Sequence, residues 1–278
     1  MRLGPKRSCE DPEVRRTPLT PSAADRAAVI LREVQSAGEV TVEDLSERLG
    51  VSAPTIRRDL SSLEAEGLLQ RTHGGATVVR PVHYEAFAYD SSYLEQEGLH
   101  AEEKRRIGLA AADLAGDGEA IGLTAGTTAT QVARSLRHRR GITVVTNTVN
   151  VAMELSRRED LSVSVVGGQL RGGWFSLVGA QAVAAVKETF LDRVFIGVNA
   201  IDAVRGLTCH HPEEAAVNRA LVEQARERIV VADRSKLGQV ALCLICPTSE
   251  VHMLITDRDA TDADIAPFAE AGVEVRRV

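Results

Sequence analysis

Several polar and glycine-rich segments between residues 125 and 236 could together bind a small anion. Each follows a short hydrophobic run that is typical of a buried strand. The first is Ala-Gly-Thr-Thr at residues 125–128, after EAIGLT. Its glycine allows close backbone approach, Thr127 and Thr128 offer hydroxyl groups, and the helix that follows presents N–H donors. A segment of this kind can hold a phosphate group.

Amide and charged groups follow three later hydrophobic runs. Asn147 comes after ITVVT, and a pair of glycines ending at Gly168 comes after LSVSVV, with Arg171 shortly behind. Asp233 and Lys236 follow RIVVA. Each of these residues alone is also what an ordinary turn uses. In a parallel sheet, however, ligands bind at the carboxyl ends of the strands. The segments together therefore predict one site for a small anionic ligand such as a sugar phosphate.

The stretch SAPTIRRDL, residues 52–60, is a second candidate site, and its chemistry suits DNA. Its serine can cap a helix, its proline suits the first turn, and its isoleucine and leucine share an inward face. An exposed helix N-terminus has free N–H groups and a positive dipole end, and nearby guanidinium groups can contact phosphates and base edges. The outer face and its N-terminal end carry Ser52, Thr55, Arg57 and Arg58.

The alternative for this helix is an ordinary solvated face. Acidic and basic residues balance within residues 1–80, so net charge does not separate the two interpretations. Their placement does, because acids gather in the preceding segment VEDLSERLG while Arg71 and His73 follow the helix. This placement favours DNA binding by the outer face of the helix together with these two residues.

The elements that position the basic residues follow from the hydrophobic pattern and the capping residues. Two short extended segments, LLQRT and ATVV, flank His73-Gly74-Gly75 and predict a hairpin. Helices are expected from Asp25 to Gly38, from the cap Thr41 to Gly50, and from Ser52 onward. This order predicts a winged helix-turn-helix DNA-binding domain over residues 23–80.

The rest of the chain divides into a tail, a linker and a larger domain. Residues 1–22 are polar and proline-punctuated and predict a disordered tail. Residues 81–98 break the apolar pattern and predict a linker. Residues 99–278 alternate helices with the strand candidates EAIGLT, ITVVTN, LSVSVVG, DRVFIGV, RIVVAD, VALCLIC, HMLIT and VEVRR. The alternation predicts an α/β fold class, with a Rossmann-like domain whose mainly parallel sheet is covered on both faces.

Composition sets further limits. The chain has 278 residues, of which 44% are hydrophobic and 26% are charged, as in ordinary globular proteins. No hydrophobic run approaches the ~18 residues of a membrane helix, and the N-terminal residues lack the apolar stretch of a secretory signal. A cytoplasmic location without a membrane partner is therefore expected. The net charge of −6 does not by itself indicate a nucleic-acid partner.

The four cysteines do not have the pattern of a disulfide framework. Cys243 and Cys246 form a CxxC, which suggests metal or redox chemistry. They lie inside VALCLIC, an apolar run that predicts a buried strand, and no second CxxC or spaced histidine pair completes a zinc site. Core cysteines are the favoured interpretation, and no metal or cofactor is expected.

Two sets of motifs resemble one protein family. SAPTIRRDLSSLEAEGLLQRTHGGA resembles the DNA-binding head of the DeoR family of bacterial transcription regulators, in which the run T-I-R-R-D-L and an H-G-G-A wing are characteristic. The later motifs EKRRIG, AGTT, VVTN, VVGG, SLVG, DRVFIGV, GLT, EEAAVNRAL, ADRSKLG and LITD resemble the effector domain of that family. The resemblance covers residues 25–258.

The resemblance implies a DNA-binding repressor of a carbohydrate-utilisation operon that is released or modulated by a phosphorylated sugar. The family's effector domain is similar to sugar-phosphate isomerases and aminosugar-phosphate deaminases. Binding to two-fold operator DNA implies a homo-oligomer, a dimer or a tetramer. Together with the strand-end pattern, the resemblance gives these effector-binding candidates: Thr124, Gly126, Thr127, Thr128, Asn147, Gly168, Arg171, Asp233 and Lys236.

One position departs from the family pattern. Many members carry an aspartate before the Gly-Thr-Thr segment, where this chain has Thr124. A threonine can bind a sugar hydroxyl, but it cannot do the acid–base work of a carboxylate. The run L-T-x-G-T-T resembles a subset of the family that regulates amino-sugar pathways.

Other functions remain as alternatives to a ligand-responsive repressor. The chain could be an active sugar-phosphate isomerase or aminosugar-phosphate deaminase with an accessory DNA-binding head. Thr124 and the lack of an evident carboxylate–histidine pair oppose an enzyme. A metal site at Cys209, His210 and His211 is disfavoured because adjacent residues rarely converge on one ion. A purely architectural DNA binder would not need the glycine-rich strand ends.

Overall fold

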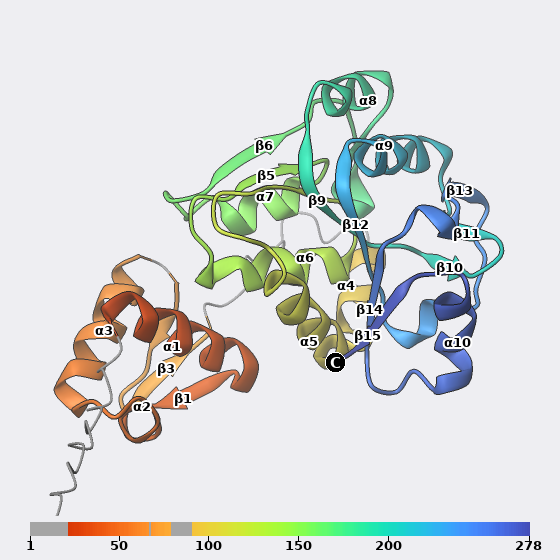
Figure 1. The fold of residues 1–278 in the computed structure, drawn as a ribbon. Coiled ribbons are helices and arrows are strands. Elements are labelled where there is room, and N and C mark those ends of the chain that lie inside the picture. The colour runs from red at the N-terminus through yellow and green to blue at the C-terminus, as the bar shows by residue number, and fades with distance from the viewer. Residues whose placement is uncertain (1–21, 67, 79–90) are drawn as a thin grey trace, which may run out of the picture.

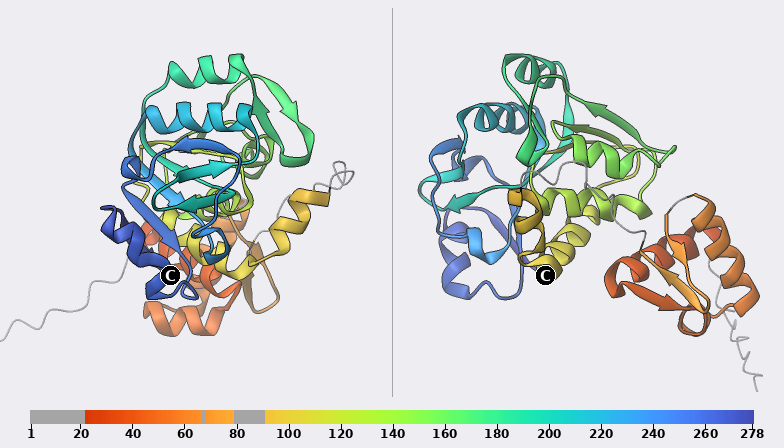
Figure 2. Two further views of the ribbon diagram at one scale, coloured as in Figure 1. Left: turned by 90° about the vertical axis from the view of Figure 1, so that its right-hand side faces the viewer. Right: turned by 180° about the vertical axis from the view of Figure 1, so that it is seen from behind.

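The computed structural model describes residues 22–66, 68–78 and 91–278 (Figure 1). Residues 1–21 of the expected tail and the first ten residues of the expected linker lie outside these ranges. A small N-terminal head lies beside a larger α/β part (Figure 2). Within the described residues, no helix combines the length and the apolar character that crossing a membrane requires.

Three helices and three short strands form the head. In chain order they are α1 (Ala23–Ala37), β1 (Glu39–Thr41), α2 (Val42–Leu49), α3 (Ala53–Ala65), β2 (Gln70–Arg71) and β3 (Gly75–Thr77). Capping sets the ends of α2 as the sequence predicts. The Thr41 hydroxyl accepts a hydrogen bond from the Asp44 N–H at 3.1 Å, and Gly50 ends the helix in the left-handed conformation. Hydrophobic residues of all three helices and of the sheet share one core, among them Ile30, Leu45, Ile56 and Ala76.

The hairpin is a wing that packs against β1. The strands of the head lie in the order β1-β3-β2 and are antiparallel. Gly75 pairs with Thr41, and a Cβ atom at Gly75 would lie 1.9 Å from the Val40 carbonyl oxygen. Only glycine fits there, because the two backbones approach so closely. The extended segment that leads into the wing is shorter than the sequence predicts, since Leu68 and Leu69 turn into the core.

A seven-stranded parallel sheet forms the centre of the larger part, as the alternation of strands and helices predicts. Its order is β15-β14-β12-β9-β4-β5-β6, and all neighbouring strands pair in parallel. The strands are β4 (Ala120–Leu123), β5 (Thr143–Thr146), β6 (Ser162–Val165), β9 (Leu191–Ile196), β12 (Ala225–Val231), β14 (Met253–Thr256) and β15 (Glu274–Arg277).

Helices cover both faces of this sheet and create two separate cores. One core packs α5 (Ala101–Ala112), α6 (Thr127–Ser135) and α7 (Val149–Leu155) against the sheet, and the other packs α8 (Ala180–Lys187), α9 (Pro212–Glu223) and α10 (Asp262–Glu270). Successive residues of β9 alternate between the cores, with Val194 and Ile196 on one side and Phe195 on the other. Burial on both faces explains why the central strands read as continuous apolar runs.

One predicted strand lies outside the parallel sheet. The run VALCLIC forms only β13 (Cys243–Cys246), which pairs antiparallel with β11 (Gly206–Cys209) in a small sheet completed by β10 (Ala200–Asp202). Ile245 and Cys246 are buried, but Leu242 is 84% exposed and Cys243 is half-buried. The expectation of a buried strand therefore holds only for the end of the run, because a small sheet beside the main one covers only one face of β13.

The last eight residues of the expected linker form a helix, α4 (Ser91–Gly98). Tyr93 anchors it, since its ring is buried and packs edge-on against Phe175 at a centroid distance of 5.2 Å. The Tyr93 hydroxyl is 2.9 Å from the Thr130 Oγ1, and burial raises the pKa of Tyr93 to about 12. The apolar pattern missed this helix because a single aromatic residue anchors it.

Arginine side chains connect the larger part to the head. Arg105 of α5 donates to the carbonyls of Gln35 and Ser36 at the end of α1, the latter at 2.6 Å. Arg137, in the 3-10 helix η2 (Leu136–His138) that continues α6, donates to the Leu68 carbonyl at 3.2 Å. The ion pairs Arg32–Asp113 (2.6 Å) and Arg140–Glu66 (3.1 Å) flank these contacts. The head thus rests on α5 and on the far end of α6.

Candidate functional site

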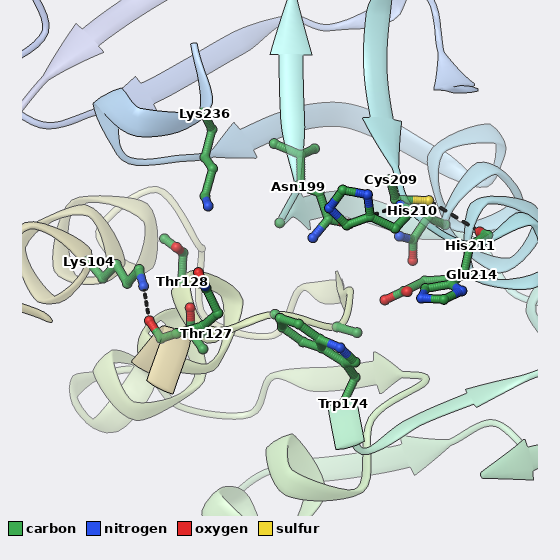
Figure 3. Close-up of a pocket in the computed structure, with 16 residues that line it drawn as sticks. Lys104, Thr127, Thr128, Trp174, Asn199, Cys209, His210, His211, Glu214 and Lys236 are labelled. Carbon is green, nitrogen blue, oxygen red and sulfur yellow. Dashed lines mark hydrogen bonds between the residues drawn. The ribbon is translucent and has the colours of Figure 1, made fainter. Parts of the chain in front are cut away.

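A polar pocket opens beside the carboxyl ends of β4, β9 and β11 (Figure 3). The start of α6 forms one wall, and the segment after β9 and the start of α9 form the opposite wall. Single residues from α4, α5 and the 3-10 helices η3 (Gly172–Trp174) and η4 (Arg234–Lys236) complete it. The side chains that Figure 3 labels are Lys104, Thr127, Thr128, Trp174, Asn199, Cys209, His210, His211, Glu214 and Lys236.

One end of the pocket is cationic. Gly126, with φ of +133°, turns the chain into α6, so that the first N–H groups of the helix and the residues Thr127 and Thr128 face the pocket. Lys104 from α5 and Lys236 from η4 extend toward these threonines (Figure 3). Lys104 is 2% exposed and donates to the Gln96 carbonyl. Burial, and then the charge of Lys236, lower the pKa of Lys104. Two ammonium groups and a helix N-terminus together can bind a phosphate.

The opposite end carries a buried carboxylate. Glu214 of α9 accepts a hydrogen bond from Arg171 at 2.9 Å. Burial raises the pKa of Glu214, although Arg171 and His211 act against this. His210 and His211 line the same end, and in Figure 3 Trp174 lies between the carboxylate and the threonines. The pocket therefore offers an anion site at one end and hydrogen-bonding groups for a polar ligand at the other.

The structure brings four of the nine predicted effector residues to the pocket wall: Gly126, Thr127, Thr128 and Lys236. Arg171 reaches the pocket through its ion pair with Glu214. The other four predicted residues serve the scaffold and are not among the lining residues: Thr124, Asn147, Gly168 and Asp233.

Local bonds explain why these four residues do not line the pocket. The Thr124 hydroxyl is buried and accepts from the Gly197 N–H at 2.9 Å, which ties the end of β4 to the end of β9. The buried Asn147 amide donates to the Leu177 carbonyl at 3.3 Å. Asp233 accepts from the Ser235 N–H at 3.1 Å and so caps η4. Gly168 packs so closely that a Cβ would lie 2.6 Å from a backbone oxygen.

Several residues that line the pocket are not identified as site residues by the sequence analysis. Lys104 and Glu214 lie in the motifs EKRRIG and EEAAVNRAL, which carry the family resemblance but do not indicate a role. His210 and His211 stand out in the sequence only as a metal possibility. In the part of the chain that the structure describes, no group of three or more His, Cys, Asp or Glu residues could hold a metal ion.

The predicted DNA-contacting residues lie on α3 and the wing of the head. Ser52, Arg57, Arg58, Arg71 and His73 are exposed, and Thr55 is half-buried. The Ser52 hydroxyl is 2.9 Å from the Thr55 hydroxyl and makes no side-chain cap. Arg71 folds back on α3, where it donates to the Ser61 hydroxyl at 3.0 Å. The basic side chains of α3 therefore face solvent, whereas the hydrogen bond to Ser61 restrains Arg71.

The acid within the basic run has a partner on another helix. Asp59 pairs with Arg26 of α1 at 2.7 Å, and both side chains are nearly buried. Asp59 therefore does not pair with Arg57 or Arg58, because its side chain turns toward α1. Among the described residues, neither guanidinium of Arg57 or Arg58 makes a hydrogen bond or an ion pair. Both remain available to an external anion.

A helix-turn-helix head with a wing, joined to an α/β domain with a polar pocket that is cationic at one end, is the arrangement of a transcription regulator with a sensor domain. The chain belongs to the DeoR family. The family model for the DeoR-like helix-turn-helix domain matches residues 26–82, and the model for the DeoR C terminal sensor domain matches residues 99–258.

Known relatives are similar over nearly their whole length. The putative aga operon transcriptional repressor of Escherichia coli O157:H7 is 34% identical over 91% of this chain and 93% of its own. The HTH-type transcriptional regulator GlpR of Haloferax volcanii is 38% identical over 91% and 96%. Among solved structures, ribose 5 phosphate isomerase A from Neisseria gonorrhoeae matches 51% of this chain and 54% of its own, with 16% identity and a TM-score of 0.36.

Proposed function

We propose that the protein represses a carbohydrate-utilisation operon and that a phosphorylated sugar in the pocket changes its affinity for operator DNA. The observation that carries the effector proposal is the convergence of Lys104 and Lys236 on the N-terminus of α6. The names of relatives as transcriptional repressors, one of them of the aga operon, support the role in transcription.

The pocket suits a ligand with a phosphate and several hydroxyl groups. A phosphate beside Thr127 and Thr128 would accept from backbone N–H groups and from both lysines. Hydroxyl groups of the sugar would then reach Glu214 and Asn199, and the indole of Trp174 would cover an apolar face of the ring. A bound ligand would desolvate the Glu214 carboxylate, which already pairs with Arg171. Only a ligand whose hydroxyl groups donate hydrogen bonds to this carboxylate would compensate for the desolvation.

For DNA binding we assign α3 to the major groove, with one of Arg57 and Arg58 at a base edge and the other at a phosphate. Ser52 and Thr55 stand at the helix N-terminus, and Arg71 and His73 would contact the adjacent backbone or the minor groove from the wing. Two-fold operator sites would require an even-numbered assembly, a dimer or a tetramer. This role would place the protein in the cytoplasm, where operator DNA lies.

An enzymatic role is the alternative, and one finding bears on it. The sequence shows no evident carboxylate–histidine pair, yet the fold brings Glu214 and His211 to the same end of the pocket. Proton transfer by such a pair is chemically feasible. We favour regulation because the relatives are named as regulators. Assaying isomerase and deaminase turnover on pentose, hexose and aminosugar phosphates separates the two, and we expect no turnover.

The proposal is tested by ligand screening on the full chain. Sugar phosphates and inorganic phosphate would be titrated while the emission of Trp174, the one tryptophan of the sequence, and the unfolding temperature are recorded. A ligand present at 100 times its dissociation constant stabilises the folded state by about 2.7 kcal/mol. The same ligand should shift the midpoint of operator binding. If no phosphorylated sugar changes either quantity, the effector proposal is wrong.

A further inference from the structure

Two cysteines face each other in the small sheet beside the pocket. Cys209 ends β11, and its directly opposite partner in the antiparallel pairing with β13 is Cys243. The facing pair is therefore Cys209 and Cys243, not the Cys243 and Cys246 of the CxxC motif. A β-bulge lies between Cys243 and Cys246 on β13, and the two cysteines of the motif are neighbours along one strand rather than cross-strand partners. Cys246 is opposite Leu207 instead.

The geometry of the facing pair fits a disulfide. Directly opposed residues of antiparallel strands have Cα atoms about 4.5–5.5 Å apart, and disulfides span Cα separations of about 4.4–6.8 Å. The two sulfur atoms also lie beside adjacent peptide groups. The Cys209 Sγ donates to the His211 carbonyl at 3.4 Å, and the Cys243 Sγ is 4.0 Å from the His210 carbonyl.

We propose that Cys209 and Cys243 form a reversible disulfide when the protein meets a peroxide. The Cys243 thiolate attacks one oxygen of hydrogen peroxide, which breaks the O–O bond, leaves Cys243 as a sulfenic acid and releases hydroxide. The sulfur of Cys209 then attacks the Cys243 sulfur and displaces its hydroxyl group, which leaves with the Cys209 proton as water. In sum, two thiols and one peroxide give one disulfide and two waters.

Cys243 and Cys209 differ in exposure, as a first attack by Cys243 on the peroxide requires. Cys243 is half-buried on an open strand and can meet the oxidant, whereas Cys209 is 2% exposed. Burial raises the pKa of Cys209 to about 11, which disfavours it as the first nucleophile. Cys246 is also buried, and its pKa is raised to about 12 by burial. Cys243, the more accessible member of the facing pair, is therefore the cysteine that reacts first with the peroxide.

Oxidation would reach the pocket, and this consequence rests on the proposed function. Cys209 lines the pocket, and its thiol bonds to the carbonyl of His211, the residue that precedes α9. A disulfide removes the S–H donor and draws the Cys209 sulfur toward β13. The carbonyl that it releases lies three residues before Glu214, so oxidation shifts the carboxylate that faces the phosphate end across the pocket and changes the electrostatic field at that end.

Peptide mapping tests the disulfide itself. The full chain would be treated with hydrogen peroxide, alkylated and digested with trypsin, which separates residues 206–219 from residues 237–258. We expect these peptides to be joined in the wild type and in Cys246→Ser, separate in Cys243→Ser, and released by a thiol reductant. A cross-link that persists in Cys243→Ser would overturn the proposal. So would oxidation of Cys243 to a sulfinic acid without any cross-link.

A second measurement tests the effect on the pocket. Inorganic phosphate would be titrated into reduced and peroxide-treated protein while the emission of Trp174 is followed. We expect the titration midpoint to change at least threefold on oxidation of the wild type and not in Cys243→Ser. An unchanged midpoint in protein shown to be cross-linked would refute the coupling to the pocket. If reduced protein does not bind phosphate, the proposed function fails, whereas the mapped disulfide still stands.

Discussion

Replacing Lys236 by alanine tests whether the cationic end of the pocket binds phosphate. Lys236 comes from η4 and extends toward Thr128, opposite the N-terminus of α6 (Figure 3). A hydrogen bond to a charged group contributes about 1.5–3 kcal/mol, and each 1.4 kcal/mol is a factor of ten in Kd. Lys236 is half-buried, so solvent screens part of this contribution. We expect Lys236→Ala to weaken phosphate binding about tenfold, toward the lower end of that range.

The assay needs a control for the loss of one positive charge. Lys187 is exposed on α8 and does not line the pocket, so Lys187→Ala removes the same charge without touching the site. Inorganic phosphate would be titrated into both variants and the wild type at one ionic strength, followed by the emission of Trp174. Operator binding by the ligand-free protein should be the same in all three, because Lys236 lies far from α3.

Two results would refute the reasoning about the phosphate end. Wild-type phosphate affinity in Lys236→Ala would mean that the lysine does not contact the anion. Equal losses in Lys236→Ala and Lys187→Ala would mean that general charge, not a built site, attracts phosphate. A third result, loss of operator binding in ligand-free Lys236→Ala, would show that this lysine supports the fold or the assembly.

Three further changes probe the head and the stability of the larger part. Arg57→Ala and Arg58→Ala should each weaken operator binding by about 1–3 kcal/mol or lower the salt slope by about 0.9, as measured by titration at several salt concentrations. Gly75→Ala should destabilise the head by about 3 kcal/mol or more in thermal unfolding, because its Cβ would meet the Val40 carbonyl, whereas Gly74→Ala has open space. Arg158 holds the pKa of Asp160 at about 2 in the folded state, below its ordinary value of 3.8. The stabilisation is therefore present above about pH 4 and is lost as the pH falls toward 2, so the unfolding midpoints of wild type and Asp160→Asn should converge over that window.

Each of these expectations has a contrary outcome. Unchanged affinity and salt slope in both arginine variants would remove α3 from the DNA interface. Equal unfolding temperatures for Gly74→Ala and Gly75→Ala would contradict the close approach of β3 to β1. A difference between wild type and Asp160→Asn that persists unchanged at pH 2 would mean that its carboxylate gains nothing from the neighbouring arginines.

Local signals predict local structure well in this chain. Thr41 and Gly50 determine the ends of α2, and the AGTT segment predicts the turn into α6, because in each case the interacting groups lie within a few residues. The central strands are predictable because burial on both faces leaves continuous apolar runs. The same signal fails for VALCLIC, since an apolar run does not reveal which sheet a strand joins or whether one of its faces stays open.

The pocket is less predictable because tertiary packing assembles it. Glu214 reaches the site from a helix more than 80 residues after the AGTT segment, and Lys104 comes from the helix before it. No spacing rule links these positions. Thr124 shows the converse, since its place at a strand end suggests a ligand contact while its hydroxyl holds the neighbouring strand. The direction of the side chain decides whether such a residue contacts a ligand or stabilises the scaffold, and this direction cannot be predicted from the sequence pattern.

The joint between head and sensor uses main-chain acceptors at its centre. Arg105 and Arg137 bond to the carbonyls of Gln35, Ser36 and Leu68, and a carbonyl oxygen is present whatever side chain the residue carries. Substitutions that retune the head for a new operator can therefore accumulate without remaking these bonds, provided that the backbone keeps its course. We expect a head exchanged from another family member to meet the same two arginines, whereas the flanking ion pairs would be kept only if that head carries the counterparts of Arg32 and Glu66.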